Sequence, residues 1–432
     1  MENDFVWGVS TSAGQIEGSS LVDGRGLSIW DAFSRIPGNI RNNDTPDPAC
    51  DSYRKWKDDV KLLKDLGVNS YRYSISWSRV LPDGKGNINQ RGLDYYKRLT
   101  DALVDEGIAP NVTLYHWDLP YALHTLGGWL NRDIADWFAD YAELIFKNLP
   151  NAGFFSTHNE PIATYMGYAR KTFPPGFMNE TWGRQANHNL LLSHGKAVER
   201  FRSLGHKGKI GIVIDVWNRV PLDPNNPADV ELAIKNNALA HGNFLHPIFS
   251  GKYEDRLLKH FEEENVKLEI GADDFKIIST PLDYYGLNCY NRIHVSSTGQ
   301  NVLKTLEKNG GNFLQNGNEY YPDAIYDTVK IVRKQYNVNI PIYITENGVG
   351  YGKEDGKNPL EDFDRIKYLK GSFASLEKAN KEGLDVRGYY LWSLMDNFEW
   401  TAGYDIKFGI HTIDRQPKAS AKFYKDWIFS HR

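Results

Sequence analysis

The chain contains two similar short runs, Gly153-Phe154-Phe155-Ser156-Thr157-His158-Asn159-Glu160-Pro161 and Ile340-Pro341-Ile342-Tyr343-Ile344-Thr345-Glu346-Asn347-Gly348. Each begins with apolar residues and ends in a polar, turn-prone tail, so each predicts a buried strand that presents a glutamate at its carboxyl end. Two carboxylates on the same edge of one sheet are what cleavage of a glycosidic bond requires. One protonates the leaving oxygen, and the other attacks or stabilises the positive sugar carbon.

The same alternation of short apolar runs and amphipathic stretches continues along the whole sequence. It predicts eight strands, at Phe5–Ser10, Ser70–Ile75, Ala109–Tyr115, Gly153–Asn159, Lys209–Asp215, Asp283–Asn288, Pro341–Glu346 and Arg387–Ser393. Helical spacing of apolar residues predicts helices at Tyr53–Leu66, Leu93–Glu106, Ile134–Lys147, Gln185–Ser203, Val230–Phe249, Pro322–Gln335, Phe363–Lys381 and Ser420–Phe429.

Eight strands, each followed by a helix, predict an α/β protein built as a closed (β/α)8 TIM barrel. An open doubly wound sheet is the alternative, but it would normally show a glycine-rich turn after its first strand, and Gly348–Gly352 does not complete that pattern. The length of 432 residues would allow two or three domains. Because no Pro- or Ser-rich linker divides the chain, we expect a single domain over residues 1–432. The irregular stretch Ser296–Asn318 is then expected to be a long loop on the catalytic rim.

Composition narrows the class of protein. Hydrophobic residues make up 41% and charged residues 25%, and the formal net charge is −4, so no basic surface for nucleic acid or anionic lipid is expected. The 12 Trp, 25 Tyr and 20 Phe are numerous. Composition alone favours an aromatic core as the explanation. Several tryptophans nevertheless lie beside polar residues, which favours aromatic platforms for sugar rings.

The sequence also suggests where the protein acts. Cys50 and Cys289 are its only cysteines, too few for a disulfide framework or a structural zinc site, and no His-Glu-x-x-His helix predicts a metal centre. Met1–Phe5 lacks the basic and apolar regions of a signal peptide, and no apolar stretch reaches the roughly 18 residues of a membrane-spanning helix. We therefore expect a cytoplasmic protein without metal, cofactor or membrane contact.

In a barrel, the active site lies at the carboxyl ends of the strands. The ends of the predicted strands and the turns after them carry an acidic pair, one Arg, one His, two Asn and several Trp: Arg72, His116, Trp117, Asn159, Glu160, Asn288, Tyr290, Glu346, Trp392, Glu399 and Trp400. Any one of them could be a capping group or a satisfied core residue. The whole set on one rim predicts an active site.

Four motifs in order make the chain resemble the family-one glycoside hydrolases, the β-glucosidase group, from Phe5 to about Ile413. They are Phe5–Gly18, which looks like the family's amino-terminal signature, Thr157–Pro161, which matches its acid/base motif, Ile344–Gly348, which matches its nucleophile motif, and Asn397–Trp400, which matches its glycone-binding motif. Each motif is short, and their combination in this order is specific.

The resemblance implies a role for each central residue. Glu160 would be the general acid and then the general base, in surroundings that raise its pKa, and Glu346 would be the nucleophile. Arg72 looks like the family arginine that pairs with the nucleophile, although a purely structural ion pair in the barrel is the alternative, and Tyr290 would donate a hydrogen bond to the same carboxylate. Asn159 resembles the residue that holds the sugar 2-hydroxyl.

The remaining contacts with the sugar are also implied by the resemblance. They would come from Gln15, His116, Trp117, Asn288, Trp392, Glu399, Trp400 and Phe408. For His116 taken alone, a satisfied core histidine would be the better interpretation, but its place at a strand end in Tyr115-His116-Trp117 favours a ligand. The implied activity is a retaining, cofactor-free, exo-acting β-glycosidase on short β-glucosides, and also on galactosides or fucosides, with the two carboxyl groups about 5–5.5 Å apart.

Three other functions are possible alternatives. A phospho-β-glycosidase would carry serine in the glycone motif, whereas Glu399-Trp400 is intact and an anionic Glu399 would repel a phosphate. A non-catalytic sugar-binding relative would be expected to lack one of the two glutamates. A glycanase for long polysaccharides fits less well with one domain and no secretion signal. The expected partner is thus a small β-glycoside, and the sequence leaves the oligomeric state open.

The chain departs from the family pattern at three positions. Gly14 stands where an aromatic residue is common, Ile162 where a Trp often follows the acid motif, and Asn318 where a Trp is expected before Glu319. The last two positions normally line the leaving-group side, so the preference for the leaving group is expected to differ. Cys289 also stands where an aromatic is common, and we interpret it as a packed thiol because no basic partner is evident.

Overall fold

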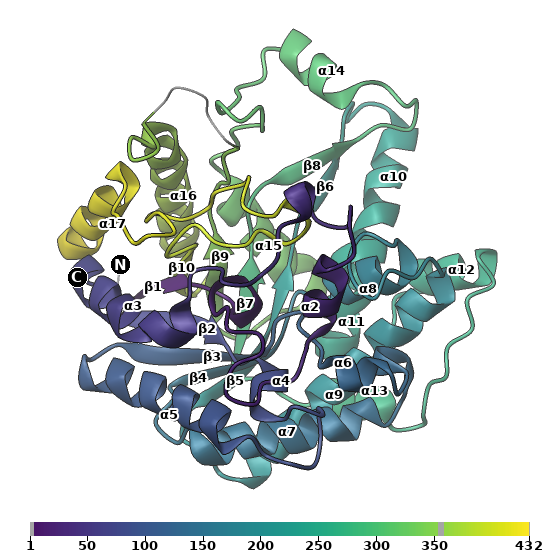
Figure 1. Cartoon of the computed structure of the whole chain (residues 1–432). Coiled ribbons are helices and arrows are strands. Elements are labelled where there is room, and N and C mark those ends of the chain that lie inside the picture. Colours follow the sequence, from purple (N-terminus) through teal and green to yellow (C-terminus); the bar gives the residue numbers. More distant parts are fainter. Residues whose placement is uncertain (1–3, 353–357, 432) are drawn as a thin grey trace.

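The computed structural model describes residues 4–352 and 358–431. Eight parallel strands close into a barrel in the order β1-β10-β9-β7-β5-β4-β3-β2, with helices around the outside (Figure 1). The barrel strands are β1 (Val6–Ser10), β2 (Ser70–Ser74), β3 (Ala109–Tyr115), β4 (Phe154–Asn159), β5 (Lys209–Asp215), β7 (Tyr284–Asn288), β9 (Ile342–Asn347) and β10 (Val386–Trp392). The TIM barrel predicted from the sequence is confirmed, and each predicted strand end lies within one residue of the observed one.

The helices form the outer layer. They are α1 (Ala13–Ile16), α2 (Ile29–Ser34), α3 (Ser52–Leu66), α4 (Trp77–Val80), α5 (Gln90–Asp105), α6 (Tyr121–His124), α7 (Ile134–Asn148), α8 (Ile162–Ala169), α9 (Glu180–Ser203), α10 (Pro227–Asn237), α11 (Asn243–Ser250), α12 (Asp255–Glu263), α13 (Asp274–Ile278), α14 (Val302–Lys308), α15 (Ala324–Tyr336), α16 (Phe363–Lys381) and α17 (Ala419–Ser430).

Helix α3 shows why the sequence forms these units. Val60, Leu63 and Leu66 recur at helical spacing and are buried. The helix ends at Gly67, which adopts φ +80° and donates its N–H to the carbonyl of Leu63, the left-handed C-cap that glycine favours.

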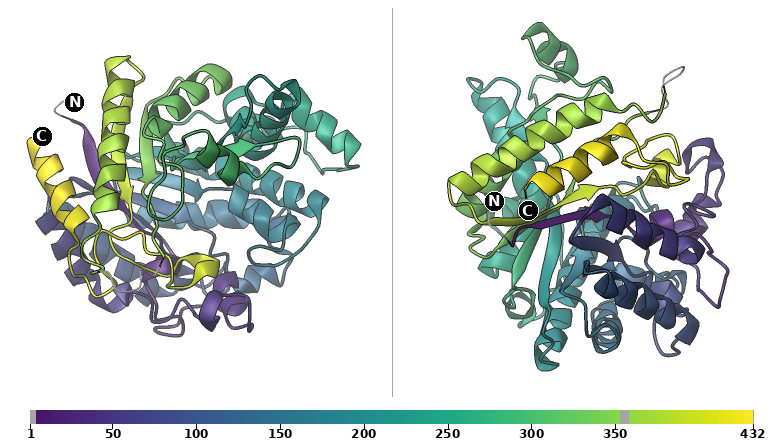
Figure 2. Two further views of the ribbon diagram at one scale, coloured as in Figure 1. Left: turned by 90° about the horizontal axis from the view of Figure 1, so that it is seen from above. Right: turned by 90° about the vertical axis from the view of Figure 1, so that its left-hand side faces the viewer.

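The first strand and the last helix pack against each other. Trp7 of β1 packs edge-on against Trp427 of α17, with ring centroids 6.5 Å apart, and Trp427 stacks on Phe373 of α16 at 4.6 Å. Figure 2 shows α17 alongside α16 and close to β1. The two ends of the described chain therefore share one part of the core.

Two predictions of local structure were incomplete. The single helix expected at Val230–Phe249 is α10 and α11 joined by a π-helical turn at Ala238–Gly242, and Pro247 lies within α11. The loop expected at Ser296–Asn318 contains helix α14. In addition, β6 (Asn218–Pro221) and β8 (Arg292–Val295) form a separate two-stranded parallel sheet beyond the ends of β5 and β7 (Figure 1).

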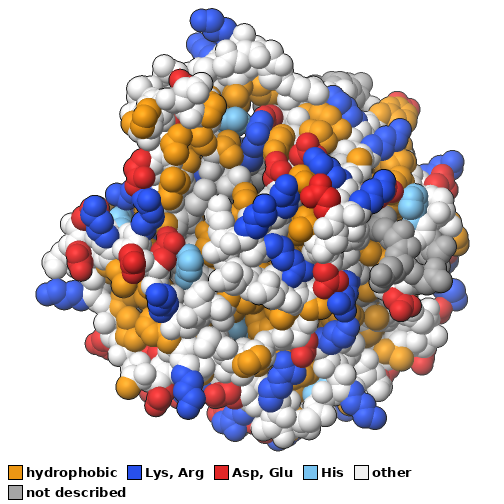
Figure 3. Space-filling model, turned by 180° about the vertical axis from the view of Figure 1, so that it is seen from behind, with side chains coloured by type: hydrophobic (Ala, Val, Ile, Leu, Met, Phe, Trp, Pro, Cys, Tyr) orange, Lys and Arg blue, Asp and Glu red, His pale blue; other side chains and the backbone are white. Residues whose placement is uncertain are grey.

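The surface carries both signs of charge. Acidic and basic side chains are intermingled over the face in Figure 3 rather than gathered into a patch of one sign. Within the described ranges, every helix is too short or too polar to cross a lipid bilayer.

Candidate active site

Glu346 lies on β9 and accepts hydrogen bonds from two strong donors. Its Oε1 accepts a hydrogen bond from Nη1 of Arg72 at 2.7 Å, and its Oε2 accepts one from the hydroxyl of Tyr290 at 2.7 Å. The side chain of Glu346 is nearly buried, at 5% exposure, and that of Arg72 is fully buried. A cation and a phenol hydroxyl thus hold both oxygens in a fixed orientation, a geometry that suits a nucleophile.

The guanidinium of Arg72, on β2, donates hydrogen bonds to side chains from several other strands. Besides Glu346, it donates from Nη2 to Oδ1 of Asn159 at 2.6 Å and from Nε to Oγ1 of Thr113 at 3.1 Å. Its acceptors therefore come from three different strands, β3, β4 and β9. This buried fork fixes the orientation of Glu346 and Asn159 at once.

Glu160 directly follows β4 and has φ +44°, the left-handed conformation of a sharp turn into α8. Its Oε1 accepts a hydrogen bond from Nδ2 of Asn288 at 2.6 Å. Burial raises its pKa well above the ordinary value, and the negative charges of Asp215 and Glu346 raise it further. A carboxyl group that retains its proton in this way suits a general acid.

The two glutamates belong to one hydrogen-bonded cluster. Nδ2 of Asn288 bonds to Glu160 and also, at 3.1 Å, to Oδ1 of Asn159, which in turn accepts the bond from Arg72. Arg72 completes the path to Glu346. The structure therefore brings together the five residues for which a catalytic role was predicted and Asn288.

Gln15 and Glu399 face each other on the opposite side of the mouth. Nε2 of Gln15 donates to Oε2 of Glu399 at 3.3 Å and to Oδ1 of Asn397 at 3.1 Å. Burial, with a further contribution from the charge of Glu346, raises the pKa of Glu399 to about 8. An amide and a carboxyl group side by side can read neighbouring sugar hydroxyls.

Four rings form a wall beside these polar groups. The imidazole of His116 stacks on Trp392 and Trp400, with centroids 5.8 and 6.1 Å away, and Trp117 packs on Trp400 at 4.6 Å. Burial, together with the charge of Arg72, lowers the pKa of His116 well below its usual value, so the imidazole is neutral. Its Nε2 lies 3.1 Å from the amide of Asn159, and its buried Nδ1 has no partner among the described residues.

A second group of rings lies beside Tyr290. The ring of Trp217 stacks almost parallel on Tyr290, with centroids 5.5 Å apart and planes 10° apart, and Phe408 meets Tyr290 edge-on at 6.2 Å. Phe408 was predicted as a site residue and lies here. Trp217 was not predicted, and neither was Asp215 at the end of β5. The rule that functional groups follow the carboxyl ends of barrel strands could have found both.

The positions that depart from the family pattern lie in different surroundings. Gly14 lies against Trp400, and a Cβ atom there would come 3.5 Å from its ring, an ordinary contact. Ile162 is the first residue of α8 and partly exposed, and Asn318 is exposed. Cys289 is fully buried, and burial raises the pKa of its thiol to about 12, which fits a packed thiol.

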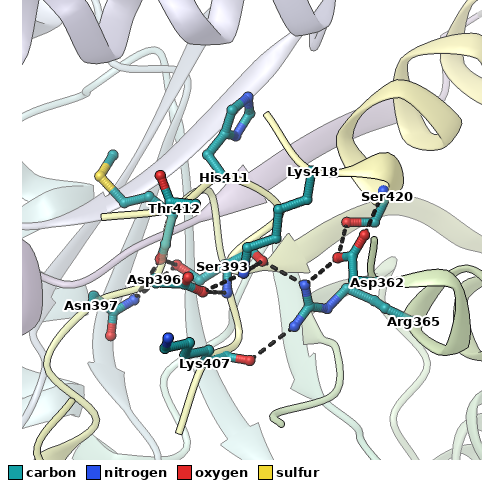
Figure 4. Close-up of polar contacts among 12 residues, drawn as sticks. Asp362, Arg365, Ser393, Asp396, Asn397, Lys407, His411, Thr412, Lys418 and Ser420 are labelled. Carbon is teal, nitrogen blue, oxygen red and sulfur yellow. Dashed lines mark hydrogen bonds and ion pairs between the residues drawn. The ribbon is translucent and has the colours of Figure 1, made fainter. Parts of the chain in front are cut away.

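The loop after β10, residues 393–411, carries Glu399, Trp400 and Phe408. Hydrogen bonds from the charged side chains of Arg365 and Lys418 anchor it (Figure 4). We call it the β10 loop. Nζ of Lys418 donates to Oδ1 of Asp396 at 2.7 Å and to the carbonyl of Gly409 at 2.8 Å. The buried guanidinium of Arg365 donates to the carbonyls of Gly409 and Lys407 at 2.6 and 2.8 Å. These contacts fix both ends of the loop to α16 and to the start of α17.

Comparison with known proteins shows the family of the chain. The chain matches the model of the family described as "Glycosyl hydrolase family 1" over residues 1–432. It is 40% identical to β-glucosidase A of Acetivibrio thermocellus, over 98% of this chain and 97% of that protein, and 41% identical to β-glucosidase A of Thermotoga maritima, over 95% and 92%. The solved T. maritima β-glucosidase in complex with glucoimidazole superposes with a TM-score of 0.89 at 39% identity, covering 99% of this chain and 98% of that one. The protein belongs to glycosyl hydrolase family 1.

Proposed function

We propose that this enzyme is a retaining, exo-acting β-glycosidase that releases the terminal β-linked glucose of short glycosides through a covalent glycosyl-enzyme intermediate. The observation that carries the proposal is the contrast within one hydrogen-bonded cluster. Glu346 is held by a cation and a phenol, whereas Glu160 is held by a neutral amide and lies near two other acids. The contrast supports an ionised nucleophile and a protonated acid in the same mouth.

In the first step, an oxygen of Glu346 attacks the anomeric carbon and forms the ester bond. The bond from that carbon to the leaving oxygen breaks, and Glu160 gives its proton to that oxygen. The amide of Asn159, which Arg72 and Asn288 hold in place, is positioned for the 2-hydroxyl, where a hydrogen bond strengthens as positive charge develops on the ring.

In the second step, Glu160 is ionised and acts as the base. It takes a proton from water, the water oxygen bonds to the anomeric carbon, and the ester bond to Glu346 breaks. Both residues return to their starting protonation states. Because the carbon is attacked twice from opposite faces, the product keeps the β-configuration.

Recognition of the sugar is assigned to the other half of the mouth. Gln15 and Glu399 would bind hydroxyl groups, the free Nδ1 of His116 would contribute another polar contact, and the tryptophan wall would receive the ring face. The relatives named β-glucosidase support glucose as the glycone, and we extend the proposal to galactosides and fucosides. The site of action we propose is the cytoplasm.

The stereochemistry of fresh product tests the mechanism. We expect proton NMR during hydrolysis of an aryl β-glucoside to detect β-glucose first, followed by slow mutarotation to the α-anomer. Initial formation of α-glucose would contradict the retaining mechanism. The panel should include galactoside, fucoside and 6-phosphoglucoside, and turnover faster on the phosphorylated sugar would overturn the choice of substrate class.

A further inference from the structure

Asp215, the last residue of β5, lies in the mouth but has no role in the mechanism above. On this strand, Gly211 lies against Tyr284 and Val213 lies against Gly286, both inside the barrel. Side chains alternate along a strand, so Asp215 points to the same interior face, at its carboxyl end. Asp215 is only 8% exposed, and within the described chain its buried Oδ1 has no hydrogen-bond partner.

The neighbours of β5 place this carboxylate next to the acid/base. Asp215 is in register with Asn288 on β7, the residue whose amide donates to Glu160. On the other side, the backbone N–H of Glu160 donates to the carbonyl of Val213 on β5 at 2.9 Å. Strand β5 thus lies between the strand that carries Glu160 and the strand that holds its side chain.

We propose that Asp215 is a positioning residue that acts through Glu160: its carboxylate, turned into the mouth beside the amide of Asn288, keeps Glu160 in the proton-carrying form that the first step requires. The inference rests on the proposed role of Glu160 as acid/base. It adds a third carboxylate to the two of the mechanism, one that touches neither reacting atom and sets the pH range of the reaction.

The charged groups around Asp215 fix the sign of its effect. They are Glu160 after β4, Glu346 on β9 and Arg219 on β6, while the nearby phenol of Tyr285 on β7 stays neutral. Burial raises the pKa of Asp215 to about 6; Glu346 contributes to the rise, and Arg219 opposes it. Above that pH Asp215 is ionised, and a like charge then disfavours ionisation of Glu160.

The alkaline limb of kcat/KM is the direct readout, because it reports loss of the proton from the free enzyme's acid. With an alkyl β-glucoside, a poor leaving group, we expect Asp215→Asn to move this limb to lower pH by roughly one unit, the size of one removed charge at an intermediate dielectric. Asp215→Glu keeps the charge and should keep the limb in place. An unshifted limb in a folded Asp215→Asn enzyme would overturn the inference.

A second substrate separates this effect from general damage. A dinitrophenyl β-glucoside needs little protonation of its leaving group, so Asp215→Asn should leave its kcat/KM near the wild-type value. An equal loss on both substrates would show a structural role and also reject the inference. If Asp215→Asn does not fold, Asp215→Ser removes the same charge and takes the same test.

Asp118 provides a matched control. It is a fully buried carboxylate whose two oxygens have no partner in the part of the chain described, and burial raises its pKa to about 7, but it is not one of the main influences on the pKa of Glu160. Asp118→Asn should leave the alkaline limb in place. Failure of the proposed function would look different: Glu160→Ala would then lose activity equally on both substrates.

Discussion

Glu346 and Glu160 lie in the same barrel mouth, yet the neighbouring strands give them electrostatically different surroundings. Glu346 accepts hydrogen bonds from the guanidinium of Arg72 and the hydroxyl of Tyr290. Glu160 accepts one from the uncharged amide of Asn288, and the charge of Asp215 opposes its ionisation. Two identical side chains therefore receive different chemical roles from their neighbours and not from their own covalent structure.

The largest effect is expected at the carboxylate with the cation. Glu346→Ala removes the attacking oxygen, and kcat for an aryl β-glucoside should fall by roughly 10⁴-fold or more, as for the loss of other enzymatic nucleophiles. The exposed glutamate Glu307 on α14 supplies the control, because Glu307→Ala should retain full activity. Robust turnover by folded Glu346→Ala would remove this residue from the mechanism.

Replacement of Glu160 should reduce kcat/KM by a factor that depends on the substrate. Glu160→Ala should reduce kcat/KM on alkyl glucosides by roughly 10²- to 10⁴-fold, the usual contribution of general acid catalysis, and much less on a dinitrophenyl glucoside. Azide should restore turnover of the variant and yield the β-glucosyl azide, since a small anion can replace the water that Glu160 activates. A loss of the same size for every leaving group would argue against an acid at position 160.

The hydroxyl of Tyr290 tests one half of the surroundings of Glu346. Tyr290→Phe deletes a single hydrogen bond to a charged group, worth about 1.5–3 kcal/mol, so kcat/KM should fall by roughly 10- to 100-fold. Tyr121→Phe is the control, because Tyr121 is 41% exposed on α6. Wild-type rates for Tyr290→Phe would mean that Arg72 alone orients the nucleophile.

The smallest effect is expected beside the cluster, at Trp217. Its ring stacks on Tyr290, and Trp217→Ala removes a contact of about 0.5–1.5 kcal/mol, so kcat/KM should fall by about two- to tenfold. If Trp217 also borders the leaving group, the loss should be greater for aryl than for methyl glucosides. Trp182→Ala, a change at a tryptophan that is 43% exposed on α9, should alter neither rate.

The barrel itself could be predicted from the sequence because each strand is a compact apolar run bounded by turn residues. Prediction from the local residue pattern failed where the same pattern is compatible with more than one local structure. The stretch at Val230–Phe249 has continuous helical spacing, but a π-helical turn at Ala238–Gly242 divides it. Strands β6 and β8 are only four residues long and partly exposed, so they lack the apolar signal of the barrel strands.

The same contrast applies to the site. The residues predicted in it follow strand ends within recognisable motifs, and the structure places them around one mouth. Asp215 and Trp217 also follow a strand end but lie in no motif. Their importance depends on the register of β5 against β4 and β7 and on how far charges act through the mouth. Neither quantity is encoded in residue spacing.

The β10 loop has a consequence for how the protein is made. Gln15, which follows the first strand, holds the loop at Asn397, and Lys418, which precedes the last helix, holds it at Asp396 and Gly409. During synthesis on a ribosome, all the barrel strands can emerge before Gln15 can bond to the β10 loop and before Lys418 has been made. The pocket proposed for the sugar therefore matures last, and a nascent chain that already carries Glu160 and Glu346 still lacks the groups proposed to select a substrate.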